Sequence, residues 1–105
     1  MSLYIAGPMT GYPEWNYPAF TKAAATLRAQ GHTVVSPHEL HDDDMTRPFD
    51  WYLRRDLKAL CECDAIVLLQ GWANSRGAKL EHHVARALDM NVYAYVLDTL
   101  SEVPK

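Results

Sequence analysis

Apolar and polar positions along this chain form two kinds of pattern, one that predicts strands and one that predicts helices. Short apolar runs bounded by glycine, proline or polar residues are typical of buried strands, whereas apolar residues spaced three and four apart are typical of amphipathic helices. The predicted strands lie at residues 3–6, 32–35, 65–69 and 91–96. The predicted helices are one capped by Asn16 and ended by Gly31, one from residue 49 or 50 to residue 60, and one over residues 76–89.

This alternation predicts the fold class. The first strand, the first helix and the second strand form a βαβ unit, whose strands we expect to be parallel with a right-handed crossover. We therefore predict an α/β fold: a small doubly wound, Rossmann- or flavodoxin-like three-layer sandwich with a four- or five-stranded, mainly parallel sheet, in which residues 1–105 form one domain. Residues 91–96 alternate enough to suggest an edge strand, and residues 98–105 show no pattern that predicts an element.

Helical spacing also predicts which side chains the two later helices bury. These positions are Leu53, Leu57, Leu60, Leu80, Val84, Ala87 and Leu88. Cys61 and Cys63 are expected to be small core residues at a helix end, because their spacing does not match the usual zinc-binding pairs. The neighbouring His82 and His83 would point about 100° apart on a helix. No metal or other cofactor is therefore expected.

Composition and charge narrow the function classes. With 49% hydrophobic and 22% charged residues, the chain resembles an ordinary globular domain. A net charge of −3 without a basic stripe argues against a nucleic-acid polymer as partner but allows a single nucleotide. The longest apolar runs are too short to cross a membrane, and the lack of a signal peptide predicts a cytoplasmic protein with reduced thiols. The polar segment with His41 and the acidic residues 42–44 is interpreted as a solvated loop.

The loop between the third strand and the last helix carries the strongest candidate for chemistry. Ser75 and Gly77 suit a loop that offers a hydroxyl and backbone N–H groups to an anion. Glu81 lies about one turn into the helix, on a stripe of small and apolar residues that should face the sheet. A carboxylate in that position is costly unless something uses it. The alternative is a structural carboxylate that the helix dipole stabilises.

Two further features belong to the same set of candidates. The first strand runs directly into a glycine-bounded loop, residues 7–11, which either cradles a phosphate or is a plain turn. Asp56 borders the apolar face of its helix, where a carboxylate is either paired with a neighbouring base or functional. The spacing alone leaves both pairs of alternatives open.

Motifs spread over residues 3–96 resemble an uncharacterised family that is common in phage and bacterial genomes. The matching segments are Tyr4-Ile5-Ala6-Gly7-Pro8-Met9-Thr10-Gly11, Asn16-Tyr17-Pro18-Ala19-Phe20, Arg55-Asp56-Leu57, Cys63-Asp64-Ala65-Ile66, Gly71-Trp72 and Ser75-Arg76-Gly77-Ala78-Lys79-Leu80-Glu81. That family is related to the nucleoside 2-deoxyribosyltransferases and to the 2′-deoxynucleoside 5′-monophosphate N-glycosidases.

This resemblance implies roles for individual residues. Glu81 matches the glutamate that attacks the sugar C1′, Asp56 matches an aspartate that assists at the base or sugar, and Tyr4 matches a tyrosine that helps to place the nucleophile and sugar. Ser75 stands where the transferases tend to carry an aspartate for the 5′-hydroxyl and the monophosphate hydrolases a serine for the 5′-phosphate. Because an aspartate would repel a phosphate dianion, Ser75 favours a nucleotide substrate.

The chain also departs from these relatives. Pro8 and Thr10 stand where the hydrolases tend to carry a serine and an arginine that grip phosphate, and Arg76 is the candidate for the missing charge. The chain is shorter than its characterised relatives and is expected to lack a final strand and a C-terminal extension. In those relatives, C-terminal residues of a neighbouring subunit complete the pocket.

Together these features predict cleavage of the N-glycosidic bond of (deoxy)nucleoside 5′-monophosphates, by hydrolysis or deoxyribosyl transfer, with Glu81 as nucleophile. The expected partner is a small-molecule nucleoside or nucleotide, with Trp72 or Tyr12 stacking on its base. The residues expected to bind it are Gly7, Met9, Thr10, Gly11, Trp72, Ser75 and Gly77. The alternative is a non-catalytic module that binds a nucleotide or nucleotide signal on the same scaffold. We also expect a homodimer or larger homo-oligomer, because so short a sheet leaves an apolar face and an edge to cover.

Overall fold

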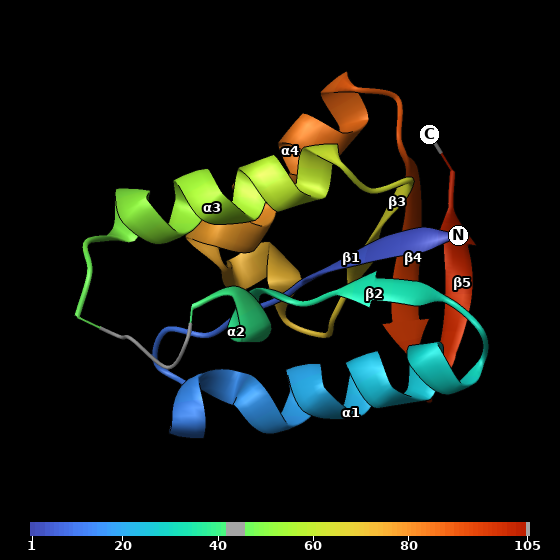
Figure 1. The fold of residues 1–105 in the computed structure, drawn as a ribbon, viewed down its shortest axis with the longest axis horizontal. Helices are drawn as coiled ribbons and strands as arrows, with labels where there is room; N and C mark the ends of the chain where they lie inside the picture. Colours follow the sequence, from blue (N-terminus) through green and yellow to red (C-terminus); the bar gives the residue numbers. More distant parts are fainter. Residues whose placement is uncertain (42–45, 105) are drawn as a thin grey trace.

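A sheet of five strands forms the centre of the fold in the computed structural model, which describes residues 1–41 and 46–104 (Figure 1). The strands stand in the order β2-β1-β3-β4-β5. They are β1 (Ser2–Ala6), β2 (Thr33–Val35), β3 (Ala65–Leu68), β4 (Asn91–Val96) and β5 (Thr99–Val103). Neighbouring strands from β2 through β4 are parallel, and β5 runs antiparallel to β4. The predicted mainly parallel sheet is confirmed.

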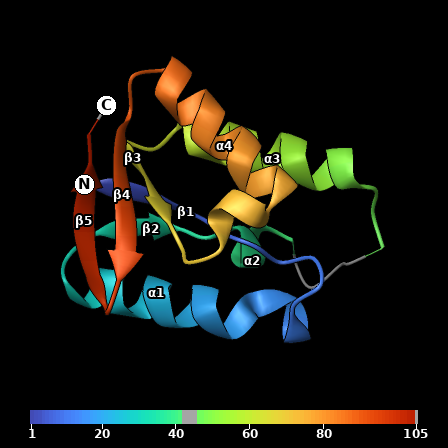
Figure 2. The same cartoon turned by 180° about the vertical axis from the view of Figure 1, so that it is seen from behind.

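Helices cover both faces of this sheet (Figures 1 and 2). α1 (Tyr17–Ala29) lies on one face, and α3 (Phe49–Cys61) and α4 (Arg76–Ala87) lie on the other. The short α2 (Pro37–Leu40) follows β2, and 3₁₀ turns form η1 (Pro13–Asn16) and η2 (Trp72–Asn74). These three layers are the doubly wound arrangement that the sequence predicts.

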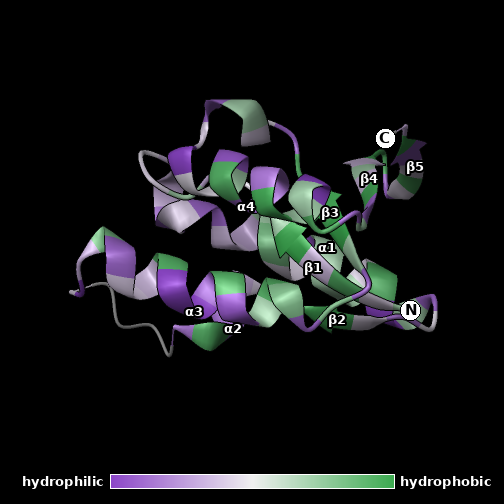
Figure 3. Ribbon diagram, turned by 90° about the horizontal axis from the view of Figure 1, so that it is seen from above, coloured by the Kyte–Doolittle hydropathy of each residue, from purple (hydrophilic) through white to green (hydrophobic). Residues whose placement is uncertain are grey.

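The central strands supply side chains to both layers of the core, because successive residues of a strand point to opposite faces. Leu3 and Ile5 of β1 belong to the same buried cluster as Phe20 of α1. Tyr4, between them, belongs to the opposite cluster together with Leu60 of α3. Burial on both faces explains why these strands read as continuous apolar runs. Figure 3 shows the apolar residues concentrated in the central strands.

The strand order reverses between β1 and β3, since β2 lies on one side of β1 and β3 on the other. In open α/β sheets a crevice forms outside the carboxyl ends of the strands at such a point. The chain segments that leave β1 and β3 meet there, with the Leu69 amide donating to the Ala6 carbonyl at 2.8 Å. Gly7 suits this close approach, because a Cβ on residue 7 would lie 2.9 Å from the Leu69 Cβ.

The C-terminal residues form an element that the periodicity does not predict. β5 pairs with β4 along its whole length, so residues 91–96 are not an edge strand and the chain does carry a last strand. The hairpin turns at Leu97 and Asp98, whose φ angles of 50° and 64° are left-handed. Such turns are usually marked by Asn-Gly or Asp-Gly. Leucine at the first position hides the turn, which is why the prediction of a patternless tail is wrong.

α4 turns a different face toward the sheet from the one that its leucines suggest. Leu80 is 39% exposed and Leu88 is 54% exposed, and Ala87 is also exposed. The residues that α4 buries are Ala78, Glu81 and Ala85. Small side chains let a helix lie close to a sheet, so the stripe that contains Glu81 packs inward and the larger side chains remain outside.

Two smaller expectations need correction, and a third falls outside the described residues. Cys61 is exposed and is not a core residue, whereas Cys63 is half-buried and packs against the margin of a core cluster. On α3 Leu60 is buried, while Leu53 and Leu57 are half-buried. The acidic run at residues 42–44, predicted to be a solvated loop, lies outside the described residues.

Candidate active site

A pocket of about 670 Å³ opens near the carboxyl ends of β1 and β3, where the strand order reverses. Its wall comes from the loop after β1, from residues around α2, from the first half of α3 and from the start of α4. The predicted site residues that line it are Gly7, Met9, Thr10, Asp56, Ser75, Gly77 and Glu81. Polar groups from distant parts of the chain thus converge on one cavity, which makes it the candidate active site.

Glu81 lines the pocket although its side chain is almost wholly inside the protein. The residue is 4% exposed, and its Oε2 accepts a hydrogen bond from the Tyr4 hydroxyl. Tyr4 is 0% exposed and lies in β1, paired with both β2 and β3. Tyr4 is therefore not among the lining residues. It holds the Glu81 carboxyl from the side of the sheet.

The proton affinity of this carboxyl is unusual. Burial is the largest influence on the pKa of Glu81, which lies at about 8; the hydrogen bond from Tyr4 lowers this pKa and the charge of Asp56 raises it. Burial and the Glu81 charge likewise raise the pKa of Tyr4 well above its usual value. At neutral pH Glu81 is therefore mainly protonated, because burial outweighs the favourable field of the α4 N-terminus.

Asp56 reaches the same pocket from α3 and has a partner that the sequence does not reveal. His41 Nε2 lies 2.8 Å from Asp56 Oδ1, and His41 is 3% exposed. The interpretation of His41 as part of a solvated loop is wrong, because α2 turns the chain inward just before it. Of the two alternatives left open above, the pairing with a base is observed, and Asp56 also lines the pocket.

The start of α4 provides the groups that suit an anion. Ser75 is the N-cap of α4, and its Oγ accepts a hydrogen bond from the Ala78 amide at 3.2 Å. The first N–H groups of a helix have no intrahelical partner, so the amides of Arg76 and Gly77 are oriented toward the N-terminal end. Arg76 lines the pocket, and its guanidinium lies 4.3 Å from the ring centre of Phe49. Arg47 adds a second cation to the lining.

The loop after β1 forms the opposite wall. Gly7, Met9 and Thr10 line the pocket, whereas Gly11 does not. Gly11 has a φ of +85° in the turn that the Tyr12 amide closes on the Met9 carbonyl, so its role is in the turn itself.

Asn16 does not cap α1 with its side chain as predicted. Its own φ of 61° is left-handed, and its Nδ2 donates to the Pro8 carbonyl at 2.8 Å. This hydrogen bond ties the start of α1 to the loop after β1.

The aromatic side chains of the pocket differ from the prediction. Trp72 does not line it; its ring packs on His82 at a centroid distance of 4.5 Å. Tyr12, the other candidate for stacking, does line the pocket. The aromatic residues that the sequence analysis missed are Trp15, Phe49 and Tyr52. The neighbouring sequence does not show whether an aromatic residue in a helix or turn will line a pocket or pack in the core.

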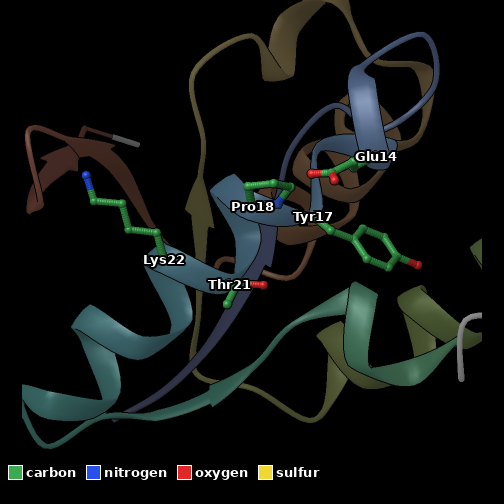
Figure 4. A pocket seen from close by; sticks show the side chains of 5 residues that line it. All are labelled: Glu14, Tyr17, Pro18, Thr21 and Lys22. Atoms are coloured by element: carbon green, nitrogen blue, oxygen red, sulfur yellow. The ribbon is translucent and has the colours of Figure 1, made fainter.

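A second depression of about 530 Å³ lies beside the start of α1 (Figure 4). Its lining residues are Glu14, Tyr17, Pro18, Thr21 and Lys22. In Figure 4 the side chains of Lys22 and Tyr17 point away from each other. Because Glu14 and Lys22 are exposed and do not converge, this surface carries no candidate chemistry.

The described residues show neither a metal-binding cluster nor a helix suited to crossing a membrane. Residues 1–41 and 46–104 contain no group of three or more metal-binding side chains. In that same part of the chain, every helix is too short or too polar to cross a membrane.

Comparisons with solved structures show which fold this chain shares. Several solved structures are similar to it, and they include two 2-deoxyribosyltransferases. One is from the psychrotolerant bacterium Bacillus psychrosaccharolyticus, with a TM-score of 0.71 and 24% identity over 90% of this chain and 71% of that one. The other is from Leishmania mexicana, with a TM-score of 0.68 and 17% identity over 98% of this chain and 78% of that one. At these identities the likeness establishes a shared fold.

No curated protein gives a significant sequence match. The sequence profile of one family does match, and it spans residues 1–94. The chain therefore belongs to the family described as domain of unknown function DUF4406, and it has the fold of the 2-deoxyribosyltransferases.

Proposed function

We propose that this protein cleaves the N-glycosidic bond of 2′-deoxynucleosides or their 5′-monophosphates, with Glu81 as the nucleophile. The observation that carries the proposal is the buried Glu81 carboxyl, held by Tyr4 and placed in one pocket with a second carboxyl, Asp56. Retaining glycosidases cleave their substrates with two carboxyl groups in this division of labour. The fold shared with 2-deoxyribosyltransferases supports the same assignment.

The reaction has two steps. In the first, a Glu81 carboxylate oxygen forms a bond to C1′ while the C1′–N bond breaks and its electron pair leaves with the base. The departing base takes a proton from Asp56 or from a water that Asp56 orients. In the second step, water attacks C1′, gives up a proton and releases the Glu81 carboxylate. A second base in place of water makes the protein a transferase.

The proton held by the two carboxyl groups of the pocket fits this sequence of steps. Glu81 must lose a proton before it attacks, and the departing base must gain one. Asp56 is the second carboxyl in the pocket, and its charge already influences the pKa of Glu81. A proton that leaves Glu81 can therefore be carried by Asp56 to the base, so one proton serves both events.

We expect the kcat/KM for base release to be level below about pH 7 and to fall about tenfold per pH unit above pH 8. The reason is that the shared proton is lost as the pH rises through the pKa of Glu81, which is about 8 in the empty protein, and the departing base then has no proton donor. The measurement is a pH profile of initial rates with a single deoxynucleotide. A profile that is flat from pH 6 to pH 9 would mean that this ionisation does not limit the reaction.

A 5′-monophosphate suits the start of α4 better than a bare 5′-hydroxyl. Ser75 provides the cap, the first-turn amides face the pocket end of the helix, and Arg76 supplies a positive charge. No described acidic residue forms an ion pair with Arg76. A guanidinium stacked on Phe49 is pre-ordered for an anion, because the ring restricts its motion.

The test is release of free base from a panel of deoxynucleoside monophosphates, deoxynucleosides and ribonucleotides. For Arg76→Gln we expect the ratio of kcat/KM for a monophosphate to that for its nucleoside to fall by about tenfold or more, as for loss of a charge-assisted hydrogen bond. Arg54→Gln is the matched control, since Arg54 is exposed and does not line the pocket. An unchanged ratio in Arg76→Gln would remove Arg76 from the phosphate site.

The same panel separates the remaining candidates. Base release without an added acceptor means a hydrolase, and release that requires a second base means a transferase. Nucleotide binding without turnover of any substrate would support the alternative, a non-catalytic binding module. Self-association also remains a prediction; the exposed Val96 and Leu97 at the β4–β5 turn are apolar surface that a second copy would cover.

A further inference from the structure

Asp56 is held in the pocket by a hydrogen bond that is largely shielded from solvent. Its Oδ1 lies 2.8 Å from His41 Nε2, and the exposed fractions of the two side chains are 13% for Asp56 and 3% for His41. A carboxylate oxygen can only accept, so Nε2 is the nitrogen that carries the proton. Hydrogen bonds to a charged acceptor in such surroundings are short and strong.

The position of His41 is determined by an anchored turn. His41 is the residue that ends α2. Arg28 of α1 donates to both carboxylate oxygens of Glu39 in α2, at 2.9 and 2.6 Å. Ser36 Oγ, at the start of α2, lies 2.5 Å from His38 Nδ1. Because these contacts join α2 to α1 and stiffen the turn itself, His41 approaches Asp56 from a defined direction.

The surroundings of His41 argue against a role in packing alone. Its ring contacts Tyr52 edge-on at a centroid distance of 4.8 Å. Its other nitrogen, Nδ1, is buried and has no hydrogen-bond partner among the described residues. An unpaired buried nitrogen is a cost that an apolar side chain of similar size would avoid. The hydrogen bond to Asp56 is the contact that compensates for it.

We propose that His41 is a positioning residue for Asp56, an inference that rests on the proposed function. By occupying Oδ1, His41 sets the plane of the carboxyl group and leaves Oδ2 to meet the substrate. When the C1′–N bond breaks, Oδ2 passes its proton to the base, and the bond's electron pair stays on the base. When water later attacks C1′, Oδ2 takes the proton that the water loses. The His41 N–H donates to Oδ1 in both steps and stabilises the carboxylate each time it forms.

Two variants separate the hydrogen bond from the packing. His41→Gln keeps an N–H donor, whereas His41→Met has a comparable volume without one. We expect His41→Met to lower kcat for base release by about tenfold or more with KM within about threefold of wild type, and His41→Gln to retain most of kcat. Wild-type kcat in His41→Met, or equal losses in both variants, would overturn the proposal. Thermal unfolding of both variants shows whether each one folds.

A measurement without substrate distinguishes this inference from the proposed function. In histidine-labelled protein, nitrogen NMR should show a protonated Nε2 on His41 whose resonance moves in Asp56→Asn. An unprotonated Nε2, or a resonance that does not move, overturns the pairing. If the resonances behave as expected but wild-type protein releases no base from any substrate, the proposed function fails and the role of His41 in it fails too, while the pairing stands.

Discussion

A Glu81→Gln variant is expected to lose base release by a factor of about 10³ or more while it keeps its fold. Glutamine has nearly the same volume, and its side-chain oxygen can still accept the hydrogen bond that the Tyr4 hydroxyl donates. The amide is a poor nucleophile and cannot take part in the covalent step at C1′. The loss should therefore appear in kcat, with binding of a deoxynucleotide retained.

The control for this experiment is Glu102→Gln, which makes the same chemical change at an exposed position of β5. This variant should keep wild-type rates. The measurement is single-turnover base release with each purified variant. Activity in Glu81→Gln within about tenfold of wild type would contradict the assignment of Glu81 as the nucleophile. It would favour the alternative in which Glu81 is a structural carboxylate near a helix N-terminus.

The same Glu81→Gln variant is expected to be more stable than the wild type at neutral pH, by about 3 kcal/mol in the free energy of unfolding at pH 7. Burial raises the pKa of Glu81 from 4.5 to about 8 on folding. Between these values the unfolded chain ionises Glu81 while the folded protein keeps it protonated, so wild-type stability falls as pH rises. Glutamine does not ionise and avoids this loss. Near pH 5 the difference should shrink to less than about 1 kcal/mol.

Glu39→Gln provides a control with the opposite sign. The hydrogen bonds from Arg28 hold the pKa of Glu39 below its usual value. A lowered pKa contributes stability above the unfolded value, and this stability is lost as pH falls. Glu39→Gln should therefore destabilise the protein at pH 7 and have less effect in acid. Urea unfolding at pH 5 and pH 7 measures both variants, and equal stability of Glu81→Gln and wild type at pH 7 would refute the buried, protonated Glu81.

Together the two Glu81→Gln results distinguish a functional carboxyl from a structural one. Replacing a residue that serves the fold makes the protein less stable. Replacing a buried residue that is kept for its chemistry makes the protein more stable but less active. Opposite changes in kcat and in the free energy of unfolding, in one variant, would be hard to explain by packing.

The sequence by itself determined the order of most strands and helices along the chain and many of the residues that line the pocket. Short apolar runs and helical spacing are local patterns, and they survive in any tertiary context that buries both faces of a sheet. Parallel neighbouring strands place their carboxyl ends at one edge, so the loop at residues 7–11 and the start of α4 had to meet there. For that reason the positions in the chain were enough to predict one site for Ser75, Gly77 and Glu81. All three residues line the pocket in the structure.

Only the tertiary structure decided features that depend on contacts between distant segments. β5 is recognisable through its pairing with β4, since Leu97 gives no turn signal. His41 meets Asp56 because contacts such as that between Arg28 and Glu39 anchor α2 beside the pocket. The residues next to His41 in the sequence give no sign of this long-range contact. The protonation of Glu81 is the clearest case. The helix N-terminus favours a charged carboxylate locally, but the surrounding elements remove water from it, and desolvation in a packed interior outweighs the local field.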